Sequence, residues 1–600
     1  MLLLTNHLGY EALGPKQAVL MTNHALETLP TARLVCAKSH QTLATYQTEP
    51  GGTVDRWHQG HFFRILFSNF DQIGQFYLAI DSLNKDTLKE DTSRENQLNN
   101  DDFVRSHTFE IRHQHLLSAT LSDVLHYFKS QRCTGVFDQQ DRHVPLYGHD
   151  AYADVHGGWY DASGDVSKYL SHLSYANYFN PQQIPMVAWN LFNGLEQLQT
   201  LDSVPAFTRL RMAEEALHGA DFLVRMQHPD GYFYMTVFDQ WSKETSKRHI
   251  CAYATQLGHK SSDFQAGFRQ GGGIAIAALA AAAQREQGGQ YRPNDYLAAA
   301  EKGYWHLISH NREYLDDGVE NIIDEYCALL ACCELYRATK QTRYLQQSQE
   351  WANKLMARQC SDDEQRHFWS ANHDGSRPYF HASDAGLPVI SLCRYLDIET
   401  GAAQRDSVQR VIEQAVRFEL SITQTVHNPF GYPRQYTKPL SGEKSARFFV
   451  PHDNETGYWW QGENARLGSL ASMAHIAQPH LDNPALCQQL DGFAEDCLSW
   501  ILGLNPFDLC MLDGAGHNNP DYLPELGFFN AKGGICNGIT SGFDDERDIA
   551  FNPSPQCDDM LQNWRWGEQW IPHAAWYLLA ICHQARRFSQ THSFSKEQAQ

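Results

Sequence analysis

From His115 onward, apolar residues recur at the 3.6-residue period of helices, and this period dominates almost to the end of the chain. About a dozen helices in sequence pairs, without strands between them, indicate a helical toroid or bundle. The helical stretches are His115–Ser130, Ile184–Leu198, Ala206–Met226, Ala275–Ala283, Tyr296–Ser309, Ile322–Ala338, Tyr344–Arg358, Ser407–Glu419, Asn464–Ile476, Ala485–Leu502 and Ala574–Arg586. The sequence therefore predicts an all-α domain over residues 113–588.

The first 112 residues follow a different rhythm, in which short apolar runs alternate with turn residues. This rhythm is typical of an all-β sandwich. The runs are Gln17–Met21, Ala32–Cys36, Phe62–Phe67, Phe76–Ile80 and Phe103–Ile111. We expect a β domain over residues 1–112 that packs beside the helical domain in a structural role. Residues 589–600 are polar and are expected to form a frayed tail.

Composition and charge limit the possible partners. A chain of 600 residues with 42% hydrophobic and 20% charged residues predicts a soluble, globular, multidomain protein. The formal net charge of -22 argues against nucleic acid and anionic membranes, and modestly favours a cationic ligand. No apolar stretch approaches the length of a transmembrane helix.

The expected compartment is the cytoplasm. Residues Met1–His7 lack the basic region of a signal peptide, and the 14 cysteines show no framework spacing. Such an enzyme would receive small, imported substrates. The sequence indicates no oligomeric state.

The stretch from Gly157 to Tyr169 holds two carboxylates, Asp161 and Asp165, separated by small residues. Ala, Ser and Gly favour a tight, accessible turn. Carboxylates held close together in a cleft raise each other's pKa, so such a pair can grip and deprotonate a water. From the pair alone, an Asp-rich turn without chemistry is an equally good interpretation.

Near the other end of the chain, Glu568 lies among three tryptophans, Trp564, Trp566 and Trp570. A carboxyl group surrounded by aromatic rings tends towards a raised pKa, which suits a general acid. Glycoside hydrolysis requires a carboxylate that acts as base and a carboxyl group that acts as acid, and these two stretches offer both.

With these two stretches the chain resembles glycoside hydrolase family 9, the inverting cellulase family with an (α/α)6 barrel. The family's Gly-Gly-Trp-Tyr-Asp-Ala-Gly-Asp loop matches residues 157–165, where Ser163 is one extra residue. The resemblance implies that Asp165 is the base, Asp161 its helper and Glu568 the acid. The segments 5–10 and 14–19 resemble the immunoglobulin-like domain that precedes the barrel in many members.

Candidate substrate-binding residues lie in three further stretches. Trp459, Trp460 and Glu463 precede a helix in an aromatic and polar loop that suits a sugar platform, although packing at the start of the helix is the alternative. The family's Pro-His-His-Arg motif is replaced by Pro524-Glu525-Leu526, so Glu525 is a candidate, and His517 is either a substitute or a surface histidine. Trp564 and Trp566 flank the predicted acid.

No cofactor is expected. Some relatives carry zinc on two Cys and two His before the base loop, but only Cys133, His143 and His149 are present here, so we expect no zinc. The cluster Asp544–Asp548 could hold a structural calcium, although it lacks an EF-hand pattern and suits a solvated turn.

The predicted reaction is inverting hydrolysis of a β-1,4 bond in a short oligosaccharide. The lost His-His-Arg motif, the surplus of acidic residues and the expected cytoplasmic location favour an exo-β-glucosaminidase acting on chitosan disaccharide, a specificity found in one subgroup of the family. The ammonium of such a sugar would meet Asp161, Glu463 or Glu525. A cellodextrinase, β-glucosidase or endoglucanase on cello-oligosaccharides is the main alternative. A non-catalytic carbohydrate-binding protein is a distant one.

Overall fold

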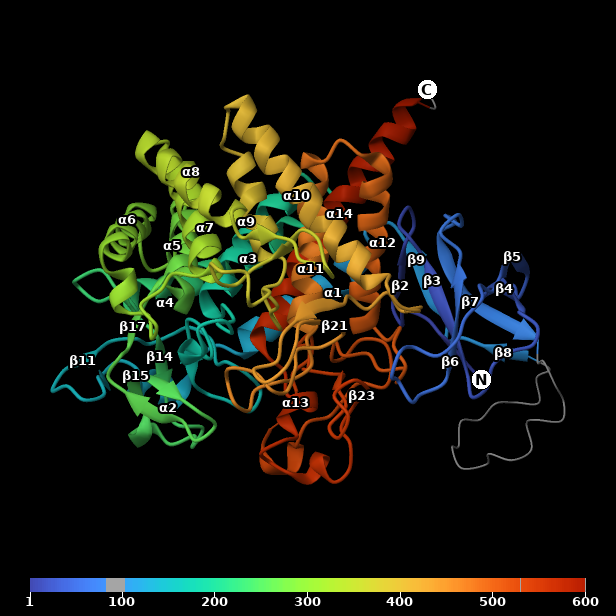
Figure 1. Ribbon diagram of the computed structural model, residues 1–600, viewed down its shortest axis with the longest axis horizontal. Coiled ribbons are helices and arrows are strands. Elements are labelled where there is room, and N and C mark those ends of the chain that lie inside the picture. The colour runs from blue at the N-terminus through green and yellow to red at the C-terminus, as the bar shows by residue number, and fades with distance from the viewer. Residues whose placement is uncertain (82–102, 529, 599–600) are drawn as a thin grey trace.

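The computed structural model describes residues 1–81, 103–528 and 530–598, with side chains to Ser589. A β domain and a larger helical domain lie side by side, the β domain at the right in Figure 1. The predicted fold class is confirmed: a β sandwich of the immunoglobulin-like kind precedes an (α/α)6 barrel.

The described residues of the β domain form two sheets, one in the order β1-β3-β6 and one in the order β2-β9-β7-β4-β5, with β8 beside β7. Apolar side chains such as Leu34, Phe63 and Leu78 fill the space between them. The strands are β1 (Leu2–Leu4), β2 (Gly9–Glu11), β3 (Gln17–Thr22), β4 (Thr31–Cys36), β5 (Thr42–Gln47), β6 (His61–Leu66), β7 (Gly74–Asp81), β8 (Phe103–Arg105) and β9 (Phe109–Arg112).

Among the residues that the structure describes, six helices form the inner ring of the barrel: α3 (Ile184–Leu198), α5 (Gly273–Ala283), α7 (Ile322–Thr339), α9 (Leu387–Leu396), α11 (Asn464–Ala477) and α14 (Ile571–Gln598). Each contacts the next, and α14 contacts α3, so the ring closes. Helix α11 is buried along its whole length, as expected of a helix covered on every side. Gly468 allows its close approach to α14, since a Cβ there would lie 2.8 Å from Trp576 Cβ.

In the described residues, six outer helices each pack mainly on one inner helix: α1 (His115–Ser130), α4 (Ala206–Arg225), α6 (Pro293–His310), α8 (Thr342–Met356), α10 (Ala402–Thr423) and α12 (Pro484–Ile501). Helix α8 buries only one stripe, Tyr344, Ser348, Trp351, Ala352 and Leu355, at the spacing of a single helix face. The helix pairs that the sequence predicts therefore consist of one helix of the outer ring and one of the inner ring.

The loops that precede the inner helices gather at one end of the barrel, at the bottom of Figure 1. They hold the short helices α2 (Gly135–Gln140) and α13 (Trp564–Gly567) and a sheet of β12 (Lys168–Tyr169), β14 (Thr236–Phe238), β15 (His249–Ala254) and β16 (His259–Ser261). Short strand pairs are β10 (Val144–Pro145) with β11 (Tyr152–Ala153), β13 (Phe233–Tyr234) with β17 (Gln265–Ala266), β18 (Gln359–Cys360) with β19 (Phe368–Trp369), β20 (Gln435–Thr437) with β21 (Ser445–Arg447), and β22 (Thr540–Ser541) with β23 (Ile549–Ala550).

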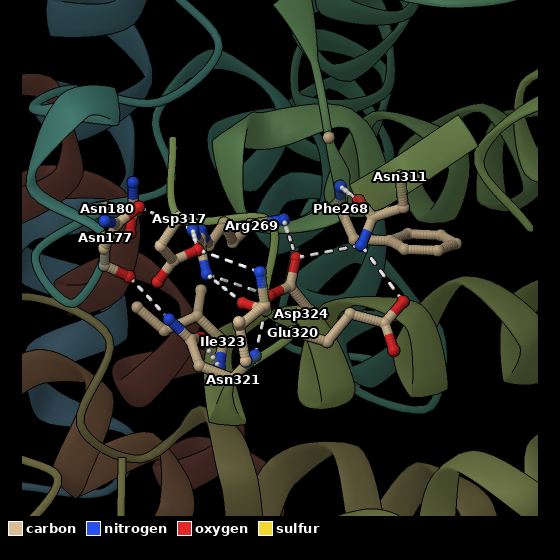
Figure 2. A network of polar contacts seen from close by, with 12 residues as sticks. Asn177, Asn180, Phe268, Arg269, Asn311, Asp317, Glu320, Asn321, Ile323 and Asp324 are labelled. Carbon is tan, nitrogen blue, oxygen red and sulfur yellow. Dashed lines mark hydrogen bonds and ion pairs between the residues drawn. The ribbon is translucent and has the colours of Figure 1, made fainter. Parts of the chain in front are cut away.

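A buried polar network fixes three of these loops to one another (Figure 2). Arg269, fully buried before α5, forms ion pairs with Asp317 at 2.7 Å and with Asp324 at 3.3 Å. Asp324 also accepts a hydrogen bond from the Asn321 backbone at the start of α7, and the Asn321 side chain donates to the carbonyl of Asn177. The loops before α3, α5 and α7 are therefore held as one unit.

The two domains are in close contact. Trp57 of the β domain packs on Phe430, Phe448 and Trp500 of the barrel. The backbone N–H of His7 donates to the carbonyl of Leu502 at 2.8 Å. The β domain thus lies beside the barrel, as the sequence predicts.

The C-terminal residues differ from expectation. Helix α14 continues to Gln598, so residues 589–598 extend a helix where the sequence predicts a frayed polar tail. Residues 599–600 lie outside the described residues. In the part of the chain that the structure describes, no helix is long and apolar enough to cross a membrane.

Candidate active site

The Asp161–Asp165 loop and the Glu568 segment, about 400 positions apart in the chain, hydrogen-bond directly to each other. The Ser163 N–H donates to the Gln569 carbonyl at 2.9 Å, and the Ile571 N–H donates to the Asp161 carbonyl at 3.1 Å. The Gln569 N–H in turn donates to Ser163 Oγ at 3.0 Å. Ser163, the extra residue of the loop, thus fixes the predicted base and the predicted acid relative to each other.

Asp165 is buried and accepts three hydrogen bonds. The Ser167 N–H donates to Oδ1 at 2.8 Å, while the Tyr169 hydroxyl and Trp241 Nε1 donate to Oδ2 at 2.7 and 3.1 Å. Burial, followed by the charge of Asp239, raises the pKa of Asp165 to about 6. At neutral pH the group is a well-oriented carboxylate that can still accept a proton.

Asp161 and Glu568 are also buried carboxyl groups close to other negative charge. Asp161 accepts a hydrogen bond from Trp570 Nε1 at 3.0 Å, and burial together with Asp165 and Glu568 raises its pKa well above the usual value. Burial and the charge of Asp165 raise the pKa of Glu568 to about 8. Glu568 is therefore protonated at neutral pH, as a general acid must be.

Gly164 allows the acid to approach the base loop. A Cβ on Gly164 would lie 2.4 Å from Glu568 Oε1, so any larger residue would displace the predicted acid. This close approach explains a glycine between the two sides of the site.

The three carboxyl groups line one cavity of about 240 Å³. Its other walls are mostly aromatic and polar, and none of the described residues that line it is Lys or Arg. Its lining consists of Asp161, Gly164, Asp165, His172, Trp241, Gln256, Tyr458, Trp459, Gln461, Tyr522, Phe528, Met560, Leu561, Trp564, Glu568 and Trp570. Aromatic rings with a few convergent polar groups are the usual lining of a sugar site.

The loop after β14 brings Trp241 to Asp165 in a strained conformation. Gln240, Trp241 and Lys243 have positive φ values of 60°, 55° and 56°, which non-glycine residues rarely adopt. The Lys243 N–H donates to Asp239 Oδ2 at 2.7 Å, and its ammonium lies 3.6 Å from the centre of the Phe528 ring. Neither Trp241 nor Lys243 is part of a recognisable motif, so sequence reasoning missed both.

Comparison with known families identifies the chain. The model of glycosyl hydrolase family 9 matches residues 118–525, more than half of the chain, and the model of the cellulase N-terminal ig-like domain matches residues 3–85. The chain belongs to glycosyl hydrolase family 9. It is a glycosidase. The match ends before Glu568, so the predicted acid lies outside the matched residues.

Solved structures share the fold of this family 9 enzyme at low identity. A metagenome-derived family 9 endoglucanase has a TM-score of 0.62 and 17% identity, covering 97% of this chain and 99% of its own. A Bacteroides ovatus family 9 protein has a TM-score of 0.62 and 15% identity, and the match covers 97% of this chain and 98% of that protein. AaCel9A in complex with cellobiose-like isofagomine has a TM-score of 0.60 and 15% identity, and the match covers 98% of this chain and 100% of AaCel9A. A search of curated proteins returned no match.

The predicted tryptophans of the family 9 enzyme divide into two groups. Trp459 and Trp564 line the cavity. Trp460 stacks on His452 with ring centres 3.8 Å apart, and Trp566 is fully buried, where its Nε1 donates to Thr540 Oγ1 at 2.8 Å. Trp460 and Trp566 are thus packing residues behind the site, which corrects the expectation that they bind substrate.

The three polar residues that the sequence predicts to bind substrate also lie outside the cavity. Glu463 is buried away from the cavity, where it pairs with Arg466 at 2.6 Å and accepts a hydrogen bond from the Val450 N–H at 2.7 Å. Glu525 is exposed in a short 3-10 helix and does not line the cavity. His517 lies beside His7 of the β domain, with ring centres 3.5 Å apart. None of the three faces the cavity of this enzyme.

The groups considered for metals have other partners. Cys133 Sγ lies 3.6 Å from Asp141 Oδ2, and His143 stacks on Tyr152. His149 packs edge-on against Phe264. In the acidic cluster, Asp548 pairs with His58 at 2.8 Å and Glu546 pairs with Arg447.

Proposed function

We propose that this family 9 enzyme hydrolyses β-1,4 bonds of short oligosaccharides by single displacement with inversion. The observation that supports this most is the convergence of Asp161, Asp165 and Glu568 on one cavity, where burial raises the pKa of Asp165 to about 6 and that of Glu568 to about 8. Between about pH 6 and pH 8, Asp165 is deprotonated and can act as base, while Glu568 is protonated and can act as acid, as the reaction requires. The two carboxyl groups of an inverting site lie about 6.5–9.5 Å apart, leaving room for a water.

In the proposed reaction, a water molecule attacks the anomeric carbon through its oxygen, and Asp165 accepts a proton from this water. Glu568 donates its proton to the glycosidic oxygen, which leaves with the electron pair of the broken bond. Asp161, held by Trp570, orients the water or a neighbouring substrate group. The three N–H and O–H donors around Asp165 fix the orientation of the carboxylate that deprotonates this water.

We propose chitosan disaccharide, or another short glucosamine-containing oligosaccharide, as the substrate. The ionised Asp165 and the absence of lysine and arginine among the described lining residues make the cavity favourable for an ammonium group, which would in turn favour the ionised form of Asp161. With Glu463 and Glu525 outside the cavity, Asp161 is the remaining candidate to contact the amine. We propose exo cleavage because it fits the small, imported substrate that the sequence predicts.

Cello-oligosaccharides are the second candidate. AaCel9A, which shares the fold, binds a cellobiose-like isofagomine. In addition, the Lys243 ammonium is close enough to the cavity to interact with Asp165 and Glu568, which disfavours a second cation nearby. The two substrates differ only in the group at position 2 of the sugar.

Turnover of chitosan disaccharide and of cellobiose by the purified protein decides between them. A charged pair between substrate and enzyme contributes about 1.5–3 kcal/mol, so a glucosaminidase should prefer the aminosugar at least about tenfold. The preference should decrease as the amine deprotonates at alkaline pH, with cellobiose as the neutral control. Equal rates would reject the glucosaminidase, and loss of both activities would reject the proposed hydrolysis.

We propose a cytoplasmic location on the basis of the thiols. All fourteen cysteines lie in the described residues and are unpaired, and most are buried. Unpaired, buried thiols suit a reducing compartment. Immunodetection of the protein in separated cell fractions tests this location.

A further inference from the structure

His517 lies with His7 and Asp508 where the β domain meets the barrel. Asp508 Oδ1 is 2.9 Å from His7 Nε2, and Asp508 Oδ2 is 3.2 Å from His517 Nε2. One potential ligand atom from each of the three residues lies within 4.8 Å of the others. In the part of the chain that the structure describes, this is the only group of three or more His, Cys, Asp or Glu residues that close together.

The spacing of these atoms suits ligands of a single metal ion. Tetrahedral zinc binds nitrogen and oxygen at about 2.0–2.2 Å, which places two ligand atoms about 3.3 Å apart. The contacts of 2.9 Å from His7 Nε2 to Asp508 Oδ1 and 3.2 Å from His517 Nε2 to Asp508 Oδ2 are hydrogen bonds, and they hold the three groups within the 4.8 Å span that ligands of one ion can occupy. Two imidazoles and a carboxylate are also a donor set that zinc prefers.

A further histidine is available beside the group. The ring of His107, from the turn between β8 and β9, packs against His517 at a tilt of 36°, with ring centres 3.8 Å apart. His7 and His107 belong to the β domain, whereas Asp508 and His517 belong to the loop after α12. An ion at this place would therefore have ligands from both domains.

His7 is held in a fixed position between two glycines. A Cβ on Gly503 would lie 2.2 Å from His7 Cδ2, and one on Gly516 would lie 2.7 Å from His7 Cβ. The His517 side chain, by contrast, is 30% exposed. Its ring lies between those of His7 and His107, whose centres are 6.5 Å apart, so two imidazoles converge on one ion only if these rings tilt relative to one another.

The loop that carries the other two ligands has a strained backbone. Asp508 and Asn518 have positive φ values of 51° and 58°. Asn518 Nδ2 donates to the Asp508 carbonyl at 2.8 Å, which stabilises this shape. Such φ values are uncommon in non-glycine residues, although Asp and Asn adopt them several-fold more often than most.

We propose that His7, Asp508 and His517 bind one Zn²⁺ ion at the domain junction, with His107 or a water as fourth ligand. Because the ligands are far apart in the unfolded chain, binding requires the two domains to be folded and docked. Zinc should therefore stabilise the docked enzyme. The site is separate from the catalytic cavity, so this proposal does not depend on the proposed substrate.

The test measures zinc binding to protein first treated with a chelator and then dialysed. Elemental analysis and calorimetry should give one Zn²⁺ per chain. Loss of groups that only support a ligand weakens metal binding about 10- to 100-fold, so H517Q should weaken it by at least about tenfold. H58Q is the matched control, because His58 also pairs with an aspartate across the domain boundary, at 2.8 Å, but lies outside the group.

Two further measurements keep the test decisive if H517Q folds poorly. D508N should show the same loss of zinc, and Zn²⁺ should raise the melting temperature of the wild type and H58Q but not of either site variant. Co²⁺ in the wild type should give ligand-field bands without a thiolate charge-transfer band. A thiolate band, undiminished binding in H517Q and D508N, or no bound zinc in the wild type would overturn the proposal.

Discussion

Two sets of buried carboxylates in this enzyme differ in what neutralises them. Asp141 lies near the base loop, where Arg248 at 2.7 Å and Lys168 at 2.7 Å contact its oxygens. Burial alone would raise the pKa of Asp141, but Lys168 and Arg248 hold it below its usual value. Asp165 and Glu568, on the cavity, accept hydrogen bonds but form no ion pair among the described residues, and their pKa values rise to about 6 and about 8.

The difference separates structural from chemical carboxylates. A carboxylate paired with buried cations stays ionised at all working pH values and contributes to the stability of the fold. A buried carboxylate that lacks a cation has a raised pKa, and where it also lines a cavity, as Asp165 and Glu568 do, it can exchange a proton with a ligand. The two sets should therefore respond in opposite ways when their charge is removed.

The largest effect is expected for Asp165→Asn, which removes the base. Loss of a general base typically lowers the rate about 10²–10⁴-fold. Because folding raises the pKa of Asp165 to about 6, its charge destabilises the fold increasingly as pH rises from about 4 to 6, so the variant should be more stable at pH 8, by up to about 3 kcal/mol.

Rate assays and thermal melts at pH 5 and pH 8 measure both effects for D165N. Near-normal turnover would place the base elsewhere, with Asp161 examined next. A lower melting temperature at pH 8 would contradict the assigned electrostatics.

Glu568→Gln should reduce activity mainly on substrates with poor leaving groups, by about 10²–10⁴-fold. The wild type should show a bell-shaped pH profile, because Asp165 must be deprotonated above about pH 6 and Glu568 protonated below about pH 8. The variant should lose the alkaline limb and retain activity on an activated aryl glycoside. Equal losses on both substrates would reject Glu568 as the acid.

Asp141→Asn should affect stability, in the direction opposite to D165N. Removing one partner of a buried ion pair leaves Lys168 and Arg248 uncompensated, at a cost of about 3–5 kcal/mol. Because folding lowers the pKa of Asp141, its stabilisation is present above pH ~4 and is lost as pH falls through the lowered value. Denaturant unfolding at pH 7 and at acidic pH checks the size and sign. Unchanged stability at pH 7 would contradict the structural role.

Trp241→Phe tests whether a hydrogen-bond donor at the cavity sets the pKa of Asp165. The ring stays but the N–H donor to Asp165 is lost, so the pKa of the base should rise by up to about one unit. Activity at pH 6 should fall severalfold and recover towards pH 7.5. Trp564→Phe is the control, because Trp564 also lines the cavity but donates to the Leu561 carbonyl. An acidic limb that does not move in W241F would remove Trp241 from this role.

Local patterns in the sequence predicted the fold class and the three carboxyl groups that the cavity brings together. The 3.6-residue period located most barrel helices to within a few residues, because each buries a stripe or a whole surface. Helix α9 was missed, since its ten residues form a short apolar run with Pro388 in its first turn. Such runs do not distinguish a buried helix from a strand.

Contacts between distant segments account for the remaining errors. Glu463 resembles a cleft residue in sequence, but Arg466, three positions later, neutralises it in the core. His517 could not be placed, because His7 lies 510 positions earlier. Trp241 depends on a left-handed backbone that its neighbours give no reason to expect.

The stereochemistry of the first product tests the central claim most directly. NMR spectra recorded during the first turnovers of the best disaccharide should show the new reducing end as the α-anomer, before mutarotation. This result follows if Asp165 directs a water to the face opposite the bond that Glu568 protonates. A β-anomer as the first product would show retention and contradict the assignment of Asp165 and Glu568.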